Sequence, residues 1–222
     1  MDLSYSGLSE NDARPLWDLF WKRRDVKSPE TWAKRRIIDI ISGYAKPGRA
    51  VLDAGCGSGF FSSYFASCGC SVYSMDYSAR ALSLTKKVIG NKSEMYIEGS
   101  VLDEKKMLGL GKRFDIIFTD GLLEHYSIED QDRIVMGMKR IKEKNGCMIN
   151  FVPNRFSFWS IVKPFYMNVK ERPFLMHEFL DLHRRNGLKI VSFGGINVLP
   201  FKVSPERPLA KYLGMLFYCI AV

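Results

Sequence analysis

The stretch Val51-Leu52-Asp53-Ala54-Gly55-Cys56-Gly57-Ser58-Gly59-Phe60 decides the fold. It begins as a short apolar run that is typical of a buried strand, and it ends where a helical pattern starts. Glycine has no Cβ, so it permits positive φ angles and lets a ligand approach the backbone, and the helix that follows presents N–H groups at its first turn. The stretch therefore predicts a ligand-binding turn between a strand and a helix.

The spacing of the glycines separates two kinds of nucleotide-binding turn. Dinucleotide-binding turns read G-x-G-x-x-G. Here the pattern is G-x-G-x-G, formed by Gly55, Gly57 and Gly59, and Asp53 stands two residues before the first glycine. The tighter turn has no pyrophosphate to accommodate, which disfavours a nicotinamide dehydrogenase, although that class stays an alternative.

A second acidic residue follows the next predicted strand. Asp76 ends the run Ser71–Met75, about 20 residues after the first glycine, where a carboxylate can accept hydrogen bonds from two ribose hydroxyls. This position predicts a ligand of the adenosine type. The alternative is that Asp76 only caps the helix that begins near Ser78.

Strands and helices alternate from Ala50 onward, and runs such as FDIIFTD are almost continuously apolar, as in parallel strands covered on both faces. With right-handed crossovers, this pattern predicts a doubly wound, Rossmann-like α/β sheet. The predicted strands are 50–54, 71–75, 94–98, 114–119, 146–152, 188–193 and 213–221, and the predicted helices are 58–68, 78–89, 127–144 and 175–186.

Two regions flank or interrupt this pattern. Residues 1–45 contain predicted helices at 10–24 and at 29–43, the second opened by Ser28 and Pro29, and we expect them to form a lid or brace on the core domain, 46–222. An insertion at about 153–175 either covers the substrate or simply packs on the sheet. Its apolar side chains are Phe156, Phe158, Trp159, Ile161, Val162, Phe165 and Tyr166, with Arg155, Lys163 and Lys170 among them, a mixture that suits a hydrophobic acceptor with an acidic group.

Composition narrows the class of protein. The chain has 222 residues, of which 46% are hydrophobic and 26% charged, as in ordinary globular proteins. Its net charge of +9 favours an anionic partner, such as nucleic acid, a phosphate-bearing metabolite or an acidic membrane surface. The first residues lack an export signal, and the apolar run from Leu213 to Val222 is too short to span a bilayer, so we expect a cytoplasmic location. The cysteines and histidines lack metal-ligand spacing, and no metal is predicted.

Four segments in order, VLDAGCGSGFF, VYSMDYS, FDIIFTDGLLEH and GCMINFVPN, resemble the class I methyltransferases, in particular the branch that acts on small molecules and on quinones or lipids. The resemblance covers roughly residues 48–195. It implies S-adenosylmethionine as methyl donor, bound at the carboxyl ends of the strands. It also implies a mostly parallel seven-stranded sheet with an antiparallel last strand.

The resemblance also implies roles for individual residues. Asp53 would hold the methionine amino group, directly or through water, and Asp76 would bind the ribose with Tyr77 against the adenine. The family often has an acidic residue where this chain has Ser100, so either Ser100 or Asp103 would reach the adenine amino group. The other predicted donor-binding residues are Gly55, Cys56, Gly57, Gly59, Val101, Thr119, Asp120 and Gly121.

His125 is the candidate catalytic residue. It follows the fourth predicted strand on the donor side, and an imidazole can accept a proton near neutral pH, which would assist transfer to a hydroxyl or an acidic carbon. A purely structural role for His125 stays open, and so do two other functions for the chain. One is an RNA methyltransferase, suggested by the positive charge but disfavoured because no [DN]-P-P-[YF] segment is present. The other is a regulatory or partner protein that binds the donor without catalysis.

Overall fold

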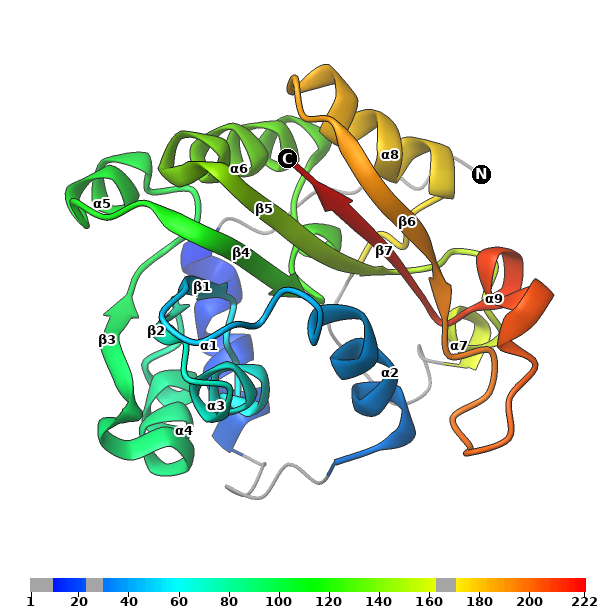
Figure 1. Cartoon of the computed structure of the whole chain (residues 1–222), viewed down its shortest axis with the longest axis horizontal. Coiled ribbons are helices and arrows are strands. Elements are labelled where there is room, and N and C mark those ends of the chain that lie inside the picture. Colours follow the sequence, from blue (N-terminus) through cyan, green and yellow to red (C-terminus); the bar gives the residue numbers. More distant parts are fainter. Residues whose placement is uncertain (1–9, 23–29, 163–170) are drawn as a thin grey trace.

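The computed structural model describes residues 10–22, 30–162 and 171–222. Within them, seven strands form one sheet in the order β3-β2-β1-β4-β5-β7-β6 (Figure 1). Neighbouring strands among β1 to β5 are parallel to each other. Strand β7 is antiparallel to both of its neighbours, β5 and β6, so β6 runs in the same direction as β5. This confirms the predicted fold. The strands are β1 (Ala50–Ala54), β2 (Ser71–Asp76), β3 (Ser93–Glu98), β4 (Phe114–Asp120), β5 (Lys142–Pro153), β6 (Ile190–Ile196) and β7 (Leu216–Ala221).

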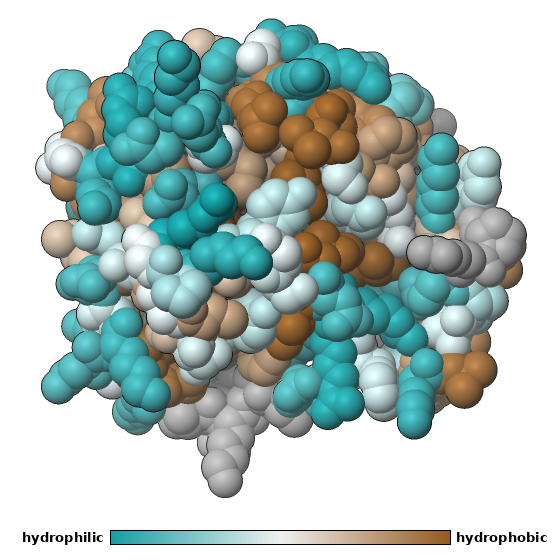
Figure 2. Space-filling view, in the orientation of Figure 1, coloured by the Kyte–Doolittle hydropathy of each residue, from teal (hydrophilic) through white to brown (hydrophobic). Residues whose placement is uncertain are grey.

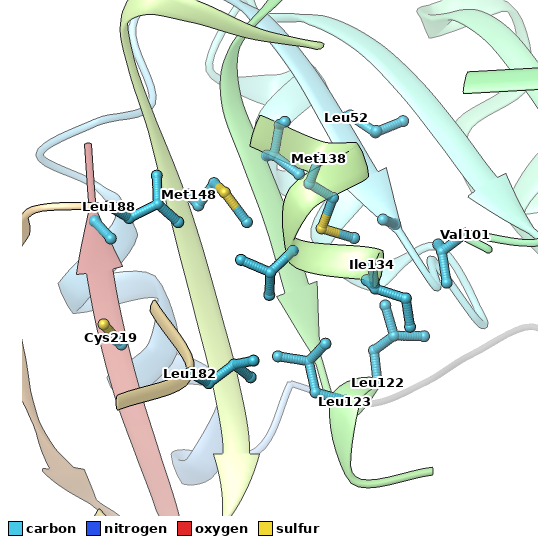
Figure 3. Packing of buried hydrophobic residues seen from close by; sticks show 14 of the residues in the cluster. Leu52, Val101, Leu122, Leu123, Ile134, Met138, Met148, Leu182, Leu188 and Cys219 are labelled. Carbon is cyan, nitrogen blue, oxygen red and sulfur yellow. The ribbon is translucent and has the colours of Figure 1, made fainter. Parts of the chain in front are cut away.

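Two buried clusters, one on each face of the sheet, form the core. On one face, α2 (Trp32–Ile41) and α3 (Phe60–Ser67) contribute apolar side chains such as Ile41 and Phe65, both fully buried. On the other face lie α5 (Glu104–Gly109), α6 (Ile128–Ile141) and α8 (Met176–Arg185). Figure 3 shows this second cluster, whose members include Leu52 of β1, Met138 of α6 and Leu182 of α8. Burial on both faces explains the continuous apolar runs of the central strands.

Helix starts follow capping chemistry. The Ser78 hydroxyl accepts a hydrogen bond from the backbone N–H of Ala81 and caps α4 (Ala79–Ile89), and Ser127 caps α6 through Asp130. The predicted cap of α2 was wrong: the helix begins at Trp32, with Thr31 as its N-cap. Ser28 and Pro29, which were expected to open it, lie outside the described residues.

The largest difference from the sequence prediction lies near the carboxyl terminus. The segment before β7 contains helix α9 (Glu206–Leu213), which was not predicted, and the last strand begins at Leu216 rather than at residue 213. Tertiary packing supports this short helix: the backbone of Ala210 lies so close to Gly195 in β6 that a Cβ on this glycine would overlap the Ala210 carbonyl. The helix therefore depends on a glycine that is distant in the sequence.

Other boundaries moved by a few residues. The predicted helix 127–144 ends at Ile141, and β5 already begins at Lys142, whose ammonium donates hydrogen bonds to the carbonyls of Glu143 and Gly146. The predicted strand 188–193 is β6, Ile190–Ile196. Short helices α5 and α7 (Phe158–Val162) were not predicted. Among the described residues, no helix combines the length and apolar character required to cross a bilayer.

Candidate donor site at the carboxyl edge of the sheet

The glycine turn lies between β1 and α3, where the carboxyl ends of the parallel strands meet. Gly55, Gly57 and Gly59 have φ angles of 78°, 53° and 77°, in the left-handed region that favours glycine. A Cβ on Gly59 would lie 2.8 Å from Cγ2 and 2.9 Å from Cα of Thr85. Two features therefore require glycine in this turn: the positive φ angles at all three positions, and the close approach of α4 to Gly59.

The N–H groups of this turn make bonds inside the protein. Those of Gly55 and Cys56 donate to the carbonyl of Met75, that of Gly59 to Cys56, and that of Gly57 to Oδ2 of Asp76 at 3.0 Å. The turn is thus held in shape before any ligand binds. What the glycines offer a ligand is a bare backbone surface, rather than these four donors, which refines the prediction of backbone contacts.

Asp76 links the glycine turn to α4. Its Oδ1 accepts a hydrogen bond of 2.9 Å from the N–H of Ser78, and Ser78 rather than Asp76 is the N-cap of α4, so the alternative prediction of Asp76 as the cap was wrong. Burial raises the pKa of Asp76 to about 6, although the hydrogen bonds from Ser78 and Gly57 act in the opposite direction. Each carboxylate oxygen can accept more than one hydrogen bond, so ribose hydroxyls fit this group.

Asp53 is turned toward the protein interior. It is 2% exposed, and Oδ2 accepts a hydrogen bond of 2.5 Å from Ser62 of α3, whose hydroxyl in turn accepts from Ser74. Burial raises the pKa of Asp53 to about 7; the Ser62 hydrogen bond opposes this, and the nearby charges of Asp120 and Asp76 add to it. The arrangement assigns Asp53 to holding the turn on α3, so of the two predicted contacts with a donor amino group the water-mediated one fits this buried side chain better than the direct one.

The end of β4 has one side chain that faces away from this edge. Oγ1 of Thr119 donates to Oδ1 of Asn150, and Nδ2 of Asn150 lies 2.7 Å from Nε2 of His183. Nδ1 of His183 lies 2.8 Å from the carbonyl of Phe179 and must donate to it, which leaves Nε2 as the acceptor. Burial lowers the pKa of His183 to about 4, so this ring is neutral. The Thr119 side chain thus belongs to a buried network, whereas Asp120 ends β4 and Gly121 follows it at the carboxyl edge.

On the predicted adenine side, Tyr77 is half-buried with the Arg14 guanidinium 6.0 Å from its ring centre. The Ser100 hydroxyl accepts from the N–H of Leu102, and Asp103 is exposed and caps α5 through the N–H of Lys106. Val101 is 5% exposed and belongs to the core, as Figure 3 shows. Asp103 is thus used as a helix cap.

Cys56 is a buried free thiol inside the glycine turn. Its Sγ lies 3.5 Å from Oγ1 of Thr85, which donates to the carbonyl of Gly57. Burial, together with the charges of Asp76 and Asp53, holds the pKa of this thiol well above its usual value. Cys56 is therefore a packing residue of the turn and carries no thiolate at neutral pH.

Helix α1 (Glu10–Lys22) lies across this edge of the sheet. A Cβ on Gly57 would come within 2.7 Å of the Trp21 indole, the Trp17 ring packs edge-on against His125 at 4.9 Å, and Asp18 accepts a hydrogen bond from Ser78. One helix thus touches the glycine turn, the α4 start and the candidate base.

His125 ends the short 3-10 helix η2 (Leu123–His125) after β4. Its Nε2 lies 3.9 Å from Oε1 of the buried Glu124, and the N–H of Arg172 donates to the Glu124 carbonyl. Three side chains could hold a metal ion here, because each offers one ligand atom and these atoms lie within 4.8 Å of one another. They are Glu124, His125 and Glu171. Sequence reasoning missed this group, because Glu171 comes from the insertion, 46 residues after His125.

Part of the insertion is described. Phe156 and Phe158 are largely exposed and Trp159 is half-buried, so the first two do not line a closed wall in this structure. Arg155 lies 3.6 Å from a Glu178 oxygen and is thus engaged with α8. The predicted wall residues Phe165 and Tyr166 and the cations Lys163 and Lys170 lie outside the described residues, as do the side chains of Ile161 and Val162.

A seven-stranded sheet of this topology, with a glycine turn after β1 and a carboxylate after β2, defines the class I methyltransferase fold. Residues 45–182 match the family described as "Methyltransferase domain", which is more than half of the chain. The chain therefore belongs to this family, as the resemblance of its motifs predicted.

Curated relatives agree. The chain is 27% identical over 159 residues to a ubiquinone biosynthesis O-methyltransferase of Pelagibacter ubique, covering 66% of this chain and 64% of the relative. It is 30% identical over 118 residues to an uncharacterized methyltransferase of Synechocystis, covering 53% of each. The chain thus spans less than two thirds of the length of these relatives.

Solved structures share the fold at low identity. One is magnesium protoporphyrin IX methyltransferase of Synechocystis with bound S-adenosylhomocysteine. The match covers 96% of this chain and 98% of that chain, with a TM-score of 0.67 and 16% identity. The N-methyltransferase NodS of Bradyrhizobium japonicum, in complex with the same compound, matches 94% and 97% with a TM-score of 0.68 and 12% identity.

Proposed function

We propose that this protein transfers a methyl group from S-adenosylmethionine to a small, hydrophobic acceptor. The observation that carries the proposal is the pairing of the glycine turn with Asp76: Gly57 is hydrogen-bonded to this carboxylate, so bare backbone and sugar-binding acceptor stand side by side. The names of the relatives, which act in ubiquinone biosynthesis or on a porphyrin, support an acceptor of this chemical kind.

When bound, S-adenosylmethionine would supply a methyl group on a sulfonium sulfur, which a nucleophile displaces in line. The protein's part is chiefly to hold two reactants in alignment, which can contribute roughly 7–11 kcal/mol. In this role Asp76 orients the ribose, the glycine turn fixes the methionine side, and Asp120 lies close enough to Asp53 to influence its ionisation. Tyr77 and Ser100 are the proposed contacts of the adenine.

His125 is the proposed proton acceptor. Its ring is 13% exposed, its Nε2 faces a Glu124 oxygen, and Trp17 packs on it, so it is positioned by neighbours on two sides. A Glu124 carboxylate at 3.9 Å would stabilise an imidazolium formed when the acceptor loses its proton. Two of these groups, Glu124 and His125, could also bind a metal ion together with Glu171, and metal titration separates the two roles.

Helix α1 is the proposed lid of the site. Its contacts with Gly57 and His125 cover the edge where donor and acceptor would meet, and exclusion of water strengthens electrostatic interactions there. Helix α2 is instead a brace, because Ile37 and Ile41 are buried against the sheet.

The test combines binding and transfer. Calorimetry with S-adenosylhomocysteine should show binding to the purified protein and a loss of at least about tenfold in affinity for Asp76→Ala, since hydrogen bonds to a charged group contribute about 1.5–3 kcal/mol. Glu94→Ala, at an exposed position of the neighbouring strand β3, is the matched control and should change affinity little. Donor with a labelled methyl group, incubated with a lipid extract and with RNA, should label the extract. Absence of binding, or label in RNA alone, contradicts the proposal.

A further inference from the structure

An exposed apolar surface lies at one end of the sheet, on the loop that follows β6 and on α9 itself. Val203 is 83% exposed, Tyr212 66% and Phe201 64%, in a protein whose other large apolar side chains are mostly buried. In Figure 2 brown side chains bordered by teal ones reach the lower right edge, where Figure 1 places this loop. We call it the apolar surface; its residues are Leu199, Phe201, Val203, Leu209, Tyr212 and Leu213.

The main chain of the loop is fixed, so its apolar side chains cannot turn inward freely. The guanidinium of Arg36 donates hydrogen bonds to the carbonyls of Leu199 and Phe201, and its Nε lies 3.3 Å from a Glu206 oxygen. The Glu206 carboxylate also accepts from the N–H groups of Asn197 and Val198. Withdrawing the loop would break a half-buried ion pair and these bonds, so the structure keeps the surface exposed.

Helix α9 presents an apolar face to solvent. Leu209, Tyr212 and Leu213 are spaced three and four residues apart, which places them on one side, and each is exposed. Ala210 is buried on the opposite side, against Gly195 of β6. An outward apolar face is the reverse of the usual surface helix, so this helix is built to contact something beyond the chain.

Charge identifies the partner. From Ile196 to Val222 the sequence has three basic residues, Lys202, Arg207 and Lys211, and a single acidic residue, Glu206. Because Glu206 is paired with Arg36, its charge is compensated. Lys202 is exposed between Phe201 and Val203, an alternation of apolar and cationic groups that suits acyl chains below an anionic headgroup layer.

The position of the surface is consistent with a membrane-facing site. Because β6 runs in the direction of β5, its carboxyl end opens at the same edge of the sheet as the glycine turn. The amide of Asn154, directly after β5, donates to the carbonyls of Tyr212 and Gly214 and joins α9 to this edge. The exposed Phe156 lies on the same turn, since its N–H donates to Asn154.

We propose that the apolar surface docks this protein on an anionic phospholipid bilayer, with its donor site facing the lipid. The docking does not depend on the proposed methyl transfer, whereas uptake of a membrane-dissolved acceptor rests on it. Vesicle binding and donor binding are separate measurements, so either can fail without the other.

The experiment is sedimentation of the full chain with vesicles of phosphatidylcholine that contain about one third phosphatidylglycerol. We expect binding that weakens with salt and that is much lower on pure phosphatidylcholine. It should fall at least about tenfold for Phe201→Ser/Val203→Ser, because two apolar side chains are then no longer buried in the bilayer. Met136→Ser, on exposed α6 surface, is the matched control and should bind as the wild type does. Lys202→Glu should lose binding to the anionic vesicles while keeping the wild-type melting temperature.

Several results would overturn the docking. They are no sedimentation of the wild type with anionic vesicles, equal binding of the Phe201/Val203 variant, or equal binding to neutral vesicles. A dimer that the same double variant dissolves, in a protein that ignores vesicles, would assign the surface to self-association instead. If the double variant is unfolded by circular dichroism, Lys202→Glu decides the outcome.

Discussion

Replacing Gly59 by alanine tests whether the donor turn is shaped by packing as well as by backbone angles. Gly48 is the matched control, because its φ of 79° is close to the 77° of Gly59 but a Cβ there would meet nothing within 4 Å. A left-handed conformation costs a residue with a Cβ roughly 1–2 kcal/mol, and both variants incur this cost. Gly48→Ala should therefore lower the free energy of unfolding by about that amount.

Gly59→Ala adds a collision. The new Cβ would lie 2.8 Å from Cγ2 and 2.9 Å from Cα of Thr85, and overpacking of this kind costs typically about 1–3 kcal/mol. We therefore expect a total loss of roughly 2–5 kcal/mol for Gly59→Ala, measured by urea denaturation with the same m-value as the wild type. Thr85 also donates to the Gly57 carbonyl, so its displacement should disturb the turn and weaken binding of S-adenosylhomocysteine, which Gly48→Ala should leave unchanged.

A second-site change sharpens this test. Thr85→Ser removes Cγ2 and keeps the hydroxyl that bonds Gly57, so Gly59→Ala/Thr85→Ser should recover part of the lost stability, as a double-mutant cycle would show. The reasoning is refuted if Gly59→Ala and Gly48→Ala lose equal stability. In that case α4 yields to the new methyl group without strain.

Four further outcomes are expected. Burial raises the pKa of Asp76 to about 6, and the ionised carboxylate should bind the donor best. Affinity for S-adenosylhomocysteine, measured by calorimetry, should therefore rise about tenfold from pH 5 to pH 7 and then level off. The affinity of Asp76→Asn should not change over this pH range. His125→Gln should lower kcat by roughly 10²–10⁴ with an unchanged Kd for that compound; an unchanged kcat removes the base role. Trp21→Ala should speed both association and dissociation of the compound in stopped-flow measurements, and equal rates would argue against a lid. Because the pKa of His183 is lowered to about 4, the protein should lose about 3 kcal/mol relative to His183→Gln between pH 7 and pH 4, and parallel stability curves would contradict its neutral state.

The donor half of the site was predictable because its information is local. The glycine pattern requires positive φ angles that hardly any other residue adopts, and the step from β1 to β2 places Asp76 beside the turn in any parallel sheet. The alternation of strands and helices and the glycine spacing therefore predicted the fold and the turn. The family was predicted from the resemblance of four segments, and the match over residues 45–182 confirms it.

The directions of the side chains were not predictable in the same way. Asp53 and Thr119 stand at the expected strand ends, but their side chains bond Ser62 and Asn150, partners on other elements. A sequence shows that a polar residue ends a strand. It does not show which neighbour in the core forms a hydrogen bond with that side chain. Helix α9 escaped prediction for a related reason, since it packs on the backbone at Gly195, where no side chain signals a contact.

The proposed acceptor side is built from segments that meet only in the folded chain, and this arrangement bears on specificity. Trp17 comes from α1, His125 from η2 and Arg172 from the insertion, and they converge through an edge-on ring contact and a backbone hydrogen bond to Glu124. None of these contacts involves the glycine turn except through Trp21 of the same α1. If His125 is the proposed base, substitutions at the insertion should change which acceptor reaches it and leave the Gly57–Asp76 bond, and the proposed donor binding, unchanged. One donor turn can in this way serve different acceptors across a family, because the surfaces that select the acceptor vary independently of it.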